Sequence, residues 1–315
     1  MRVVFLGSGS FAIPSLEALL EAGHDVAAVV TQPDREKGRG REIAPPPLKP
    51  VAAARGLTVL QPRRMREPES AAAVKALAPD IQVVVAYGQI LPRAVIDIAP
   101  RGTVNVHASL LPRYRGAAPV QWAIVNGERE TGVTTMLIDE GLDTGPLLLS
   151  RATLIGDDET AEALEARLAR LGGELLVETL AGLETGAVVP RPQDHAQATL
   201  APLIKKEDGL ADWRQPAEAL ARRVRGFHAW PGVYTTLRGR TLRILRARPL
   251  GLVDDATLPG AESGTLVKVD REGLVVACGP GTALRLDEVQ PESRHAMPAA
   301  AFAAGARLSV GERLG

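Results

Sequence analysis

The sequence predicts an α/β fold, in which a Rossmann-like, doubly wound and mostly parallel sheet is followed by a small OB-like β-barrel domain. Apolar runs at residues 2–7, 25–30 and 81–88 alternate with amphipathic segments. This is the pattern of parallel strands that helices cover on both faces. From residue 207 onward, short strands separated by glycine turns replace it, as in a small barrel. A chain of 315 residues is long enough for both domains.

The first domain is expected to span residues 1–188. After its first strand, Leu16, Leu19 and Leu20 form the apolar stripe of a helix that ends at Gly23. Residues 31–47 are rich in glycine and proline, so we expect no regular structure there. The later strands are predicted at residues 25–30, 57–62, 81–88, 102–108 and, as a pair, within 131–150. The later helices are predicted at residues 48–56, 67–79, a short segment after 92, 118–128 and 157–183.

The second domain is expected to span residues 207–315, after a linker at 189–206. The linker carries prolines, no clear period and one histidine, His195, which we expect to be an exposed loop residue. One helix is predicted at residues 216–227. Five strands are predicted at residues 233–239, 241–249, 264–270, 273–279 and 283–289.

Composition narrows the class of protein. No run approaches the ~18 apolar residues of a membrane helix, and residues 2–7 read as a strand rather than a secretory leader, so we expect a cytoplasmic protein. The single cysteine, Cys278, has no partner for an internal disulfide and no metal-ligand neighbours. We therefore expect it to be a small buried side chain in a strand, and we expect no metal site.

The charge is balanced overall but unevenly distributed. Residues 222–248 contain eight arginines and no acidic residue, which is typical of a surface that faces a polyanion. A solvated arginine face in an arginine-rich protein is the alternative. Because the run overlaps the entry helix and first hairpin of the expected barrel, a fold that often binds nucleic acid, we favour polyanion binding.

The turn after the first strand, GSGSFA at residues 7–12, matches a loose dinucleotide-binding fingerprint. A nicotinamide enzyme would place an acid near the end of the second strand, and Asp34 stands only approximately there. Any turn between a strand and a helix in a doubly wound sheet also favours glycine. Both readings, nucleotide binding and a structural turn, stay open on these residues alone.

Asn105 and His107 are two residues apart at the end of an expected strand, so their side chains project from the same face. Further along, DEGLDTG at residues 139–145 ends another strand with Asp139 and Asp143. A carboxylate near His107 would hold the imidazole in a defined tautomer or as the imidazolium. The alternative is that Asn105 caps a loop and His107 is a hydrogen-bonded core residue.

An amide, an imidazole and a carboxylate without a serine or cysteine nucleophile suit a reaction in which the substrate brings its own nucleophile. When an amine attacks a carbonyl group, Asn105 and His107 can stabilise the oxyanion. Asp143 can accept the proton that the new ammonium group loses.

The segments VVVAYGQILP, NVHASLLPRYRGAAPVQWAI and ETGVTTMLIDEGLDTG together resemble the folate-dependent formyltransferases. The resemblance implies that Asn105, His107 and Asp143 transfer a formyl group from 10-formyltetrahydrofolate to an amine. It also implies a folate site made of Ser109, Leu110, Leu111, Pro112, Tyr87, Gly88, Gln89, Ile90, Leu91 and Asp139.

The segment TQPDREKGRGREIAPPPLK at residues 31–49 resembles the basic insertion loop of the branch that formylates the methionine of charged initiator tRNA. Residues 212–232 and the barrel after them resemble the tRNA-binding domain of that branch. The resemblance implies a tRNA-binding set made of Arg39, Arg41, Arg222, Arg223, Arg225 and Arg243. The first turn departs from the family pattern GTP-x-FA at Ser8 and Gly9, which leaves any folate contact there in doubt.

The expected activity is transfer of the formyl group to the α-amine of initiator methionyl-tRNA, for translation initiation, by a monomer that needs folate and no metal or membrane. A sugar-nucleotide or other small-amine formyltransferase is the alternative within the family. A nicotinamide-dependent Rossmann dehydrogenase and a non-enzymatic RNA-binding protein are alternatives outside it.

Overall fold

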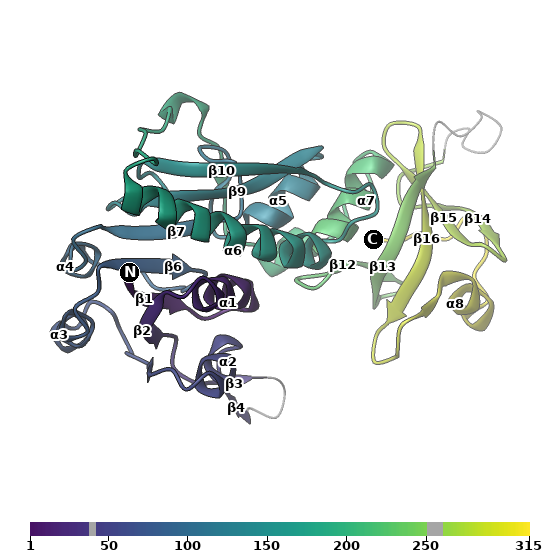
Figure 1. The fold of residues 1–315 in the computed structure, drawn as a ribbon. Coiled ribbons are helices and arrows are strands. Elements are labelled where there is room, and N and C mark those ends of the chain that lie inside the picture. The colour runs from purple at the N-terminus through teal and green to yellow at the C-terminus, as the bar shows by residue number, and fades with distance from the viewer. Residues whose placement is uncertain (38–41, 251–260) are drawn as a thin grey trace. The chain divides into compact units, whose positions relative to one another are not determined.

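The computed structural model describes residues 1–37, 42–250 and 261–315 (Figure 1). The chain divides into two compact units. The first unit is made of Met1–Pro119, Glu130–Leu154 and Glu165–Pro202. The second unit is made of Val120–Arg129, Ile155–Leu164 and Leu203–Gly315. The expected boundaries at residues 188 and 207 remain a prediction about the domains.

The first unit is built on a seven-stranded sheet with the order β10-β9-β7-β6-β1-β2-β5. Its strands are β1 (Arg2–Gly7), β2 (Asp25–Val30), β5 (Val59–Leu60), β6 (Ile81–Val85), β7 (Thr103–His107), β9 (Glu130–Leu137) and β10 (Leu147–Leu154). The five strands from β5 to β7 pair in parallel, whereas β9 runs antiparallel to both β7 and β10. The predicted mostly parallel sheet is confirmed.

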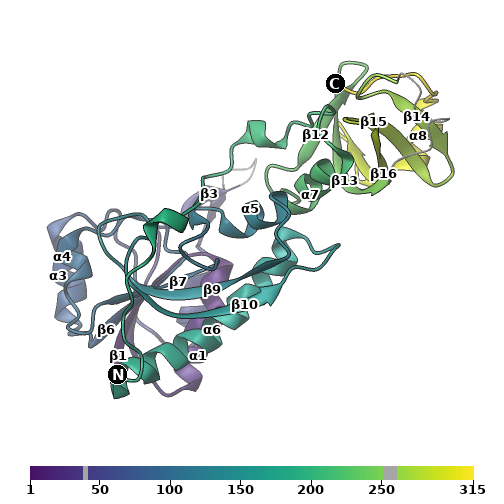
Figure 2. The same cartoon turned by 90° about the horizontal axis from the view of Figure 1, so that it is seen from above.

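Helices cover both faces of this sheet, which explains why β6 is buried along its whole length (Figures 1 and 2). The helical elements of the first unit are η1 (Ser10–Ala12), α1 (Ile13–Glu21), α2 (Leu48–Ala54), α3 (Pro68–Ala76), α4 (Arg93–Ile96), most of α6 (Ala161–Thr185) and η2 (His195–Gln197). All of α5 (Pro119–Val125) except Pro119 belongs to the second unit. On one face α3 and α4 contribute Val74, Val95 and Ile96 to a cluster with Val4 and Val84.

On the opposite face α6 packs against β7 and α1 through two adjacent glycines. A Cβ added at Gly172 would lie 2.9 Å from Val106, and one at Gly173 would lie 2.8 Å from the Pro14 carbonyl oxygen. Real Cβ atoms are not found that close, so the absence of a side chain sets how near α6 can lie. Val106 therefore points toward α6, and its strand neighbours point the other way.

The expectation that residues 31–47 lack regular structure is wrong for two short segments. β3 (Arg35–Lys37) and β4 (Glu42–Ala44) form an antiparallel pair, with Arg35 opposite Ala44. The prolines of the segment lie outside both strands, so they remove no donor from this ladder.

The second unit carries the five predicted strands as an antiparallel sheet with the order β12-β13-β16-β15-β14, and β17 pairs with β16. Its elements are η3 (Lys206–Gly209), α7 (Ala217–Gly226), β12 (Val233–Leu237), β13 (Arg240–Leu250), β14 (Leu266–Asp270), β15 (Gly273–Cys278), β16 (Thr282–Pro291), β17 (Met297–Pro298) and α8 (Ala299–Ala306). The sequence did not predict β17 or α8. Alanine fills most of α8, so its apolar periodicity is weak.

The segment after α8 joins the two outer strands of this sheet. Leu314 bridges to Leu237 at the end of β12, and Arg313 bridges to Thr265 just before β14. The backbone N–H of Leu266 donates to the Glu312 carbonyl at 2.7 Å. These bonds close the sheet in the manner expected of an OB-like barrel, because closure leaves no open edge.

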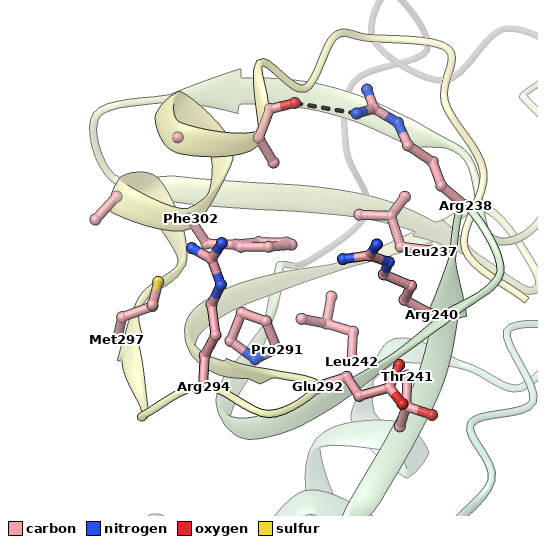
Figure 3. A pocket seen from close by; sticks show the side chains of 13 residues that line it. Leu237, Arg238, Arg240, Thr241, Leu242, Pro291, Glu292, Arg294, Met297 and Phe302 are labelled. Atoms are coloured by element: carbon pink, nitrogen blue, oxygen red, sulfur yellow. Dashed lines mark hydrogen bonds between the residues drawn. The ribbon is translucent and has the colours of Figure 1, made fainter.

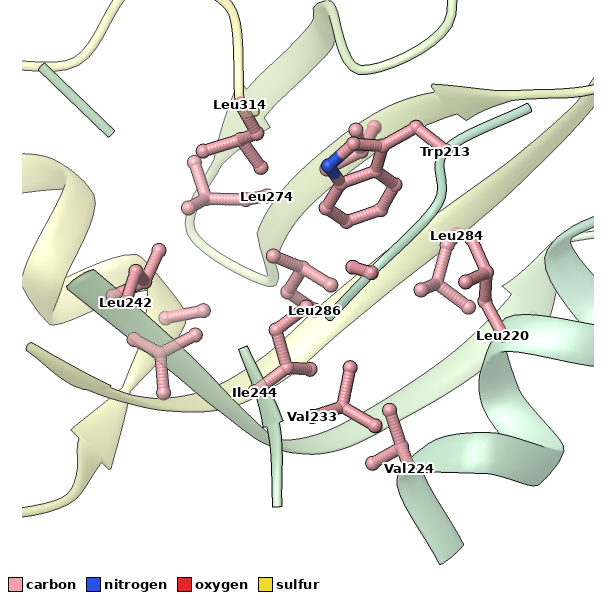
Figure 4. Close-up of a cluster of buried hydrophobic side chains, with 14 of the residues drawn as sticks. Trp213, Leu220, Val224, Val233, Leu242, Ile244, Leu274, Leu284, Leu286 and Leu314 are labelled. Carbon is pink, nitrogen blue, oxygen red and sulfur yellow. The ribbon is translucent and has the colours of Figure 1, made fainter. Parts of the chain in front are cut away.

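The core of the second unit lies between α7 and the concave face of the sheet (Figure 4). Trp213 is its largest side chain, and its indole N–H donates to the Thr235 hydroxyl at 3.2 Å. Around it lie Leu220 and Val224 from α7 and strand residues that include Leu286. Cys278 belongs to the same core and is buried, as predicted. Burial raises the pKa of its thiol to about 12, which keeps it protonated and unreactive.

Candidate active site

Asn105 and His107 project from the face of β7 opposite Val106 and α6. Asn105 pairs in register with Val84 of β6 and Met136 of β9, so it lies in the interior of the sheet. His107 is buried, whereas Asn105 is half-buried. Within the described residues, the carboxamide of Asn105 makes no hydrogen bond to protein. The predicted pair therefore shares one face and leaves the amide available to a ligand.

The tautomer of His107 follows from a backbone contact. Its Nε2 lies 2.9 Å from the carbonyl oxygen of Tyr114. A carbonyl oxygen can only accept, so Nε2 carries a proton and donates it. The other nitrogen, Nδ1, faces Asp143 at 3.7 Å from Oδ2. That separation exceeds a hydrogen bond.

Asp143 reaches the site by a route that the strand pattern did not predict. Because β9 is antiparallel to β7, the loop after it starts beside the opposite end of β7, where the Ile138 N–H donates to the Thr103 carbonyl at 2.8 Å. The loop then folds back along β7 to place Asp143 next to His107. The Gly116 N–H donates to Asp143 Oδ2 at 2.8 Å and fixes the carboxylate there.

Asp139 organises this loop from within. Its Oδ1 accepts from the Gly141 N–H at 3.0 Å and from the Thr144 hydroxyl at 2.6 Å. A Cβ at Gly145 would lie 1.8 Å from the Leu137 carbonyl oxygen. The loop therefore closes on itself tightly, and Asp143 takes a left-handed conformation with φ +51°. A folate contact by Asp139 remains a prediction.

A buried polar group that the sequence did not single out braces the same loop. Gln193 is 6% exposed, and its Nε2 donates to the carbonyls of Asp143 and Gly145 at 2.9 and 2.8 Å. Its Oε1 accepts from the buried Arg115 guanidinium at 2.6 Å. His195 is exposed, as predicted, but its Nδ1 lies 3.0 Å from the same guanidinium. No local pattern marks Gln193, since it lies in a segment without periodicity.

A short parallel strand pair holds this brace in place. β11 (Leu200–Ala201) pairs with β8 (Arg115–Gly116). A Cβ at Gly116, where φ is +120°, would lie 2.6 Å from the Ala201 carbonyl oxygen. Residues up to Pro202 belong to the first unit, so the first part of the expected linker forms part of the site's support.

The predicted folate segment, Ser109 to Pro112, follows His107 directly and is held by its own hydrogen bonds. The Ser109 hydroxyl donates to the Arg113 carbonyl at 2.6 Å, and the Thr134 hydroxyl donates to the Ser109 carbonyl at 2.7 Å. Ser109 and Leu111 are buried, whereas Leu110 and Pro112 are half-buried. The segment can therefore offer a ligand backbone groups and the two half-buried side chains.

The predicted segment from Tyr87 to Leu91 divides into buried and exposed side chains. The Tyr87 ring is in the core, and its buried hydroxyl has no partner among the described residues. Burial raises the pKa of that hydroxyl. Gln89 anchors the segment by accepting from the Met65 N–H at 2.9 Å, and Gly88 allows a φ of +80°. Ile90 is 94% exposed. Only Ile90 therefore presents a large apolar side chain to a ligand.

Ser8, one of the two departures in the first turn, links three loops. Its hydroxyl donates to the Tyr87 carbonyl at 3.0 Å and accepts from the Gln32 N–H at 3.0 Å. Gly9 has φ −76° and ψ 170°, which proline also adopts. The departure therefore keeps the backbone conformation that a proline at position 9 would have.

Asp34 does not stand free for a nucleotide ribose. The Gln61 amide donates to it at 2.7 Å and the Lys49 ammonium at 2.8 Å. These two hydrogen bonds hold the pKa of Asp34 below its ordinary range. The carboxylate thus serves to join β2 to neighbouring segments, which favours a structural role for the glycine turn.

The four described arginines that are predicted to bind tRNA have contacts within the second unit. Arg222 donates to the Val125 carbonyl at 3.2 Å, and Arg225 donates to the Glu159 carbonyl at 3.1 Å. Arg223 donates to the Asp208 carbonyl and lies over the Phe227 ring. Burial lowers the pKa of Arg223 and Arg225. Arg243 contacts Gln290 at 3.4 Å. Their role toward tRNA remains a prediction.

Arg39 and Arg41 lie outside the described residues. Among the described residues, no cluster of three or more histidine, cysteine or acidic side chains is arranged to share a metal ion. No described helix has the length and apolar character needed to span a membrane.

Two family models match the chain. The model described as "Formyl transferase" matches residues 1–180, and "Formyl transferase, C-terminal domain" matches residues 203–307. Two curated relatives named methionyl-tRNA formyltransferase, from Solibacter usitatus and Geobacter sulfurreducens, are 56% and 49% identical over the whole of this chain. The matches cover 99% and 97% of those relatives.

Solved structures share the fold at lower identity. An N-formyltransferase from Helicobacter canadensis, in complex with folinic acid and dTDP-3-aminofucose, has a TM-score of 0.67 and 17% identity, and the match covers 92% of this chain and 99% of that one. HypX from Aquifex aeolicus with tetrahydrofolic acid has a TM-score of 0.65 and 20% identity, covering 99% of this chain and 48% of that one. With both family models, the close relatives and the converging asparagine, histidine and aspartate in agreement, the chain belongs to the formyl transferase family.

Proposed function

We propose that the protein transfers the formyl group of 10-formyltetrahydrofolate to the α-amine of initiator methionyl-tRNA, giving N-formylmethionyl-tRNA. The observation that carries this proposal is the approach of Asp143 to His107 at 3.7 Å on the face of β7 that also bears Asn105. Full-length relatives at 49–56% identity with this named activity support the choice of acceptor.

The reaction needs no covalent intermediate with the protein. The neutral α-amine attacks the formyl carbon and forms a tetrahedral intermediate with an oxyanion. The Asn105 amide donates to that oxygen, and His107 also donates to it when Nδ1 is protonated. Asp143 accepts the proton that the attacking nitrogen loses. The bond between the formyl carbon and N10 then breaks, and N10 gains a proton.

The predicted folate segments offer a reduced folate two kinds of contact. Residues 109–112 offer backbone groups, and Ile90 offers an exposed apolar side chain. Two structures of the same fold were determined with folate compounds: HypX with tetrahydrofolic acid, and the N-formyltransferase from Helicobacter canadensis with folinic acid. Action as a monomer and a cytoplasmic location are further parts of the proposal.

The deciding experiment follows the label. Purified protein is mixed with formyl-labelled 10-formyltetrahydrofolate and charged initiator tRNA, uncharged tRNA, or charged tRNA whose methionine carries an N-acetyl block. Label on methionine in the first mixture alone is the expected result. Transfer to an amino sugar nucleotide, with none to charged tRNA, would instead favour the small-amine alternative.

A further inference from the structure

A cavity in the second unit is lined by none of Arg222, Arg223, Arg225 and Arg243, the described arginines predicted to bind tRNA. It measures about 320 Å³ and opens between the β12–β13 turn, the segment after β16, and α8 (Figure 3). Volumes of this order hold small ligands. Leu237, Leu242, Pro291, Met297 and Phe302 give it an apolar lining.

Three arginines border the cavity, and they are not equivalent. Arg238 forms two hydrogen bonds to the Glu312 carboxylate, at 2.7 and 2.8 Å, and donates to the Ala306 carbonyl. Arg240 and Arg294 are exposed and have neither an ion pair nor a side-chain hydrogen bond within the described residues. Two cationic groups are thus left for a ligand.

An aromatic ring, that of Phe302, lies in the cavity together with the guanidinium groups of Arg240 and Arg294. In Figure 3 the guanidinium groups of Arg240 and Arg294 are drawn on either side of the Phe302 ring, above Pro291 and Leu242. Phe302 is half-buried, so its ring is fixed against the core while part of it faces the cavity. Thr241 and Glu292 lie together at the rim and can accept hydrogen bonds.

We propose that this cavity binds one unstacked nucleotide, whose base lies on Phe302 between the two guanidinium planes and whose phosphate pairs with Arg240 or Arg294. Single-stranded nucleotides are commonly held by aromatic and arginine planes together with phosphate contacts. The rim acceptors suit a ribose hydroxyl or an exocyclic amine. That the nucleotide belongs to the tRNA rests on the proposed function, and a free nucleotide is the second source of the same chemistry.

A filling variant tests the cavity without removing any existing contact. Ala301 lines the cavity from the exposed side of α8, so Ala301→Trp should occupy the space of the base. Ala304→Trp is the matched control, because Ala304 is exposed on the same helix but does not line the cavity. We expect Ala301→Trp to weaken tRNA binding about 10-fold, the scale of one lost stacked base, and Ala304→Trp to change it less than twofold.

A charge variant tests the phosphate contact. Arg294→Gln should lower the slope of log binding constant against log salt by about 0.7, as for one contact to a single strand. Arg271→Gln, an exposed arginine of the same unit outside the cavity, should leave the slope unchanged. Native-like thermal unfolding of each variant shows that the fold is kept.

Binding measurements distinguish a nucleotide of tRNA from a free nucleotide as the ligand. They also test the cavity independently of the proposed formyl transfer. Each of the four nucleoside 5′-monophosphates is tested by equilibrium dialysis beside filter binding of tRNA, with no formyl donor present. Loss of tRNA binding by Ala301→Trp supports the RNA source, and loss of monophosphate binding alone supports the free nucleotide. If Ala301→Trp and Ala304→Trp behave alike toward both ligands, the inference is wrong. Failure of the wild-type protein to formylate charged tRNA would overturn the proposed function and leave these binding results standing.

Discussion

The active site and the arginine strip at residues 222–248 are opposite cases of how polar and charged residues come together. At the site, His107, Asp143 and Gln193 are far apart along the chain and meet in space. In the strip, even the adjacent Arg222 and Arg223 donate to different carbonyls, those of Val125 and Asp208. Arg240, in the same strip, has no side-chain partner within the described residues. What a charged group can bind depends on the partners it already has, and sequence density does not report those partners.

His107→Ala should give the largest effect and break the site directly. The substitution removes the group that can donate to the oxyanion, so turnover should fall about 100-fold or more. Steady-state kinetics with charged tRNA measure the change. His24→Ala, a half-buried histidine before β2, is the control. Near-normal turnover of His107→Ala would remove His107 from the reaction.

Gln193→Ala should have the next largest effect, because it keeps the Asp143 side chain but removes the hydrogen bonds that position its loop. The carbonyls of Asp143 and Gly145 lose the amide that they accept from, and the Arg115 guanidinium keeps only its contact with His195 among the described residues. We expect kcat to fall on the order of 10-fold through loop misplacement, with KM changed less than twofold. Gln197→Ala is the control, since Gln197 is exposed and its side chain donates to Asp194, the one hydrogen bond that it makes within the described part of the chain. Equal kcat values for both variants would show that the brace does not position Asp143.

Arg223→Gln and Arg240→Gln together sharpen the contrast within the strip. Arg223 is held by the Asp208 carbonyl and the Phe227 ring, so its loss should cost about 1 kcal/mol of unfolding free energy. Because the Arg223 guanidinium already has these partners, tRNA binding should change less than on loss of Arg240, although both arginines lie in the predicted strip. Arg240→Gln should do the reverse, with unchanged stability and weaker, less salt-dependent tRNA binding. Urea unfolding and filter binding measure the two quantities. A reversed pattern would mean that existing partners do not determine which arginines bind.

Gly9→Pro, in the turn after β1, should have the smallest effect. The φ of −76° suits proline, and a Cβ there would meet only Ala86 at 3.9 Å. Proline restricts the conformations of the unfolded chain, so the substitution should raise the free energy of unfolding by about 0.5 kcal/mol. Gly23→Pro, where φ is +76°, should destabilise it. Urea unfolding measures both, and a destabilised Gly9→Pro would show that the first turn needs glycine.

Much of the fold followed from residue patterns because those patterns report burial. The alternation of apolar strands and amphipathic helices predicted the parallel sheet, and the two-residue spacing placed Asn105 and His107 on one face. β3, β4, β17 and α8 were missed because they are short or alanine-rich. Their formation depends on tertiary contacts that have no local signature.

The sequence predicted that Asp143 joins His107, and the structure brings the two side chains to 3.7 Å, but the path of the loop between them was not predicted. The parallel-sheet rule places functional loops at the carboxyl ends of strands, whereas the loop of Asp143 starts from the other edge and folds back. That fold depends on Asp139, Gly145 and Gln193 acting together. Only the last of these lies outside the loop itself, and sequence spacing cannot relate it to the site.

The hydrogen bonds from Gln193 and the pairing of β11 with β8 determine where a hybrid of this protein and a relative can be joined. The "Formyl transferase" match ends at residue 180, yet the carbonyls of the aspartate loop are held from residue 193 and the strand behind Gly116 lies at residues 200–201. A hybrid protein joined at residue 180 would take Asn105, His107 and Asp143 from one relative. It would take the residues that hold the aspartate loop, Gln193 and Leu200–Ala201, from the other relative. A junction after residue 201 keeps the site residues and the residues that hold them in the same protein.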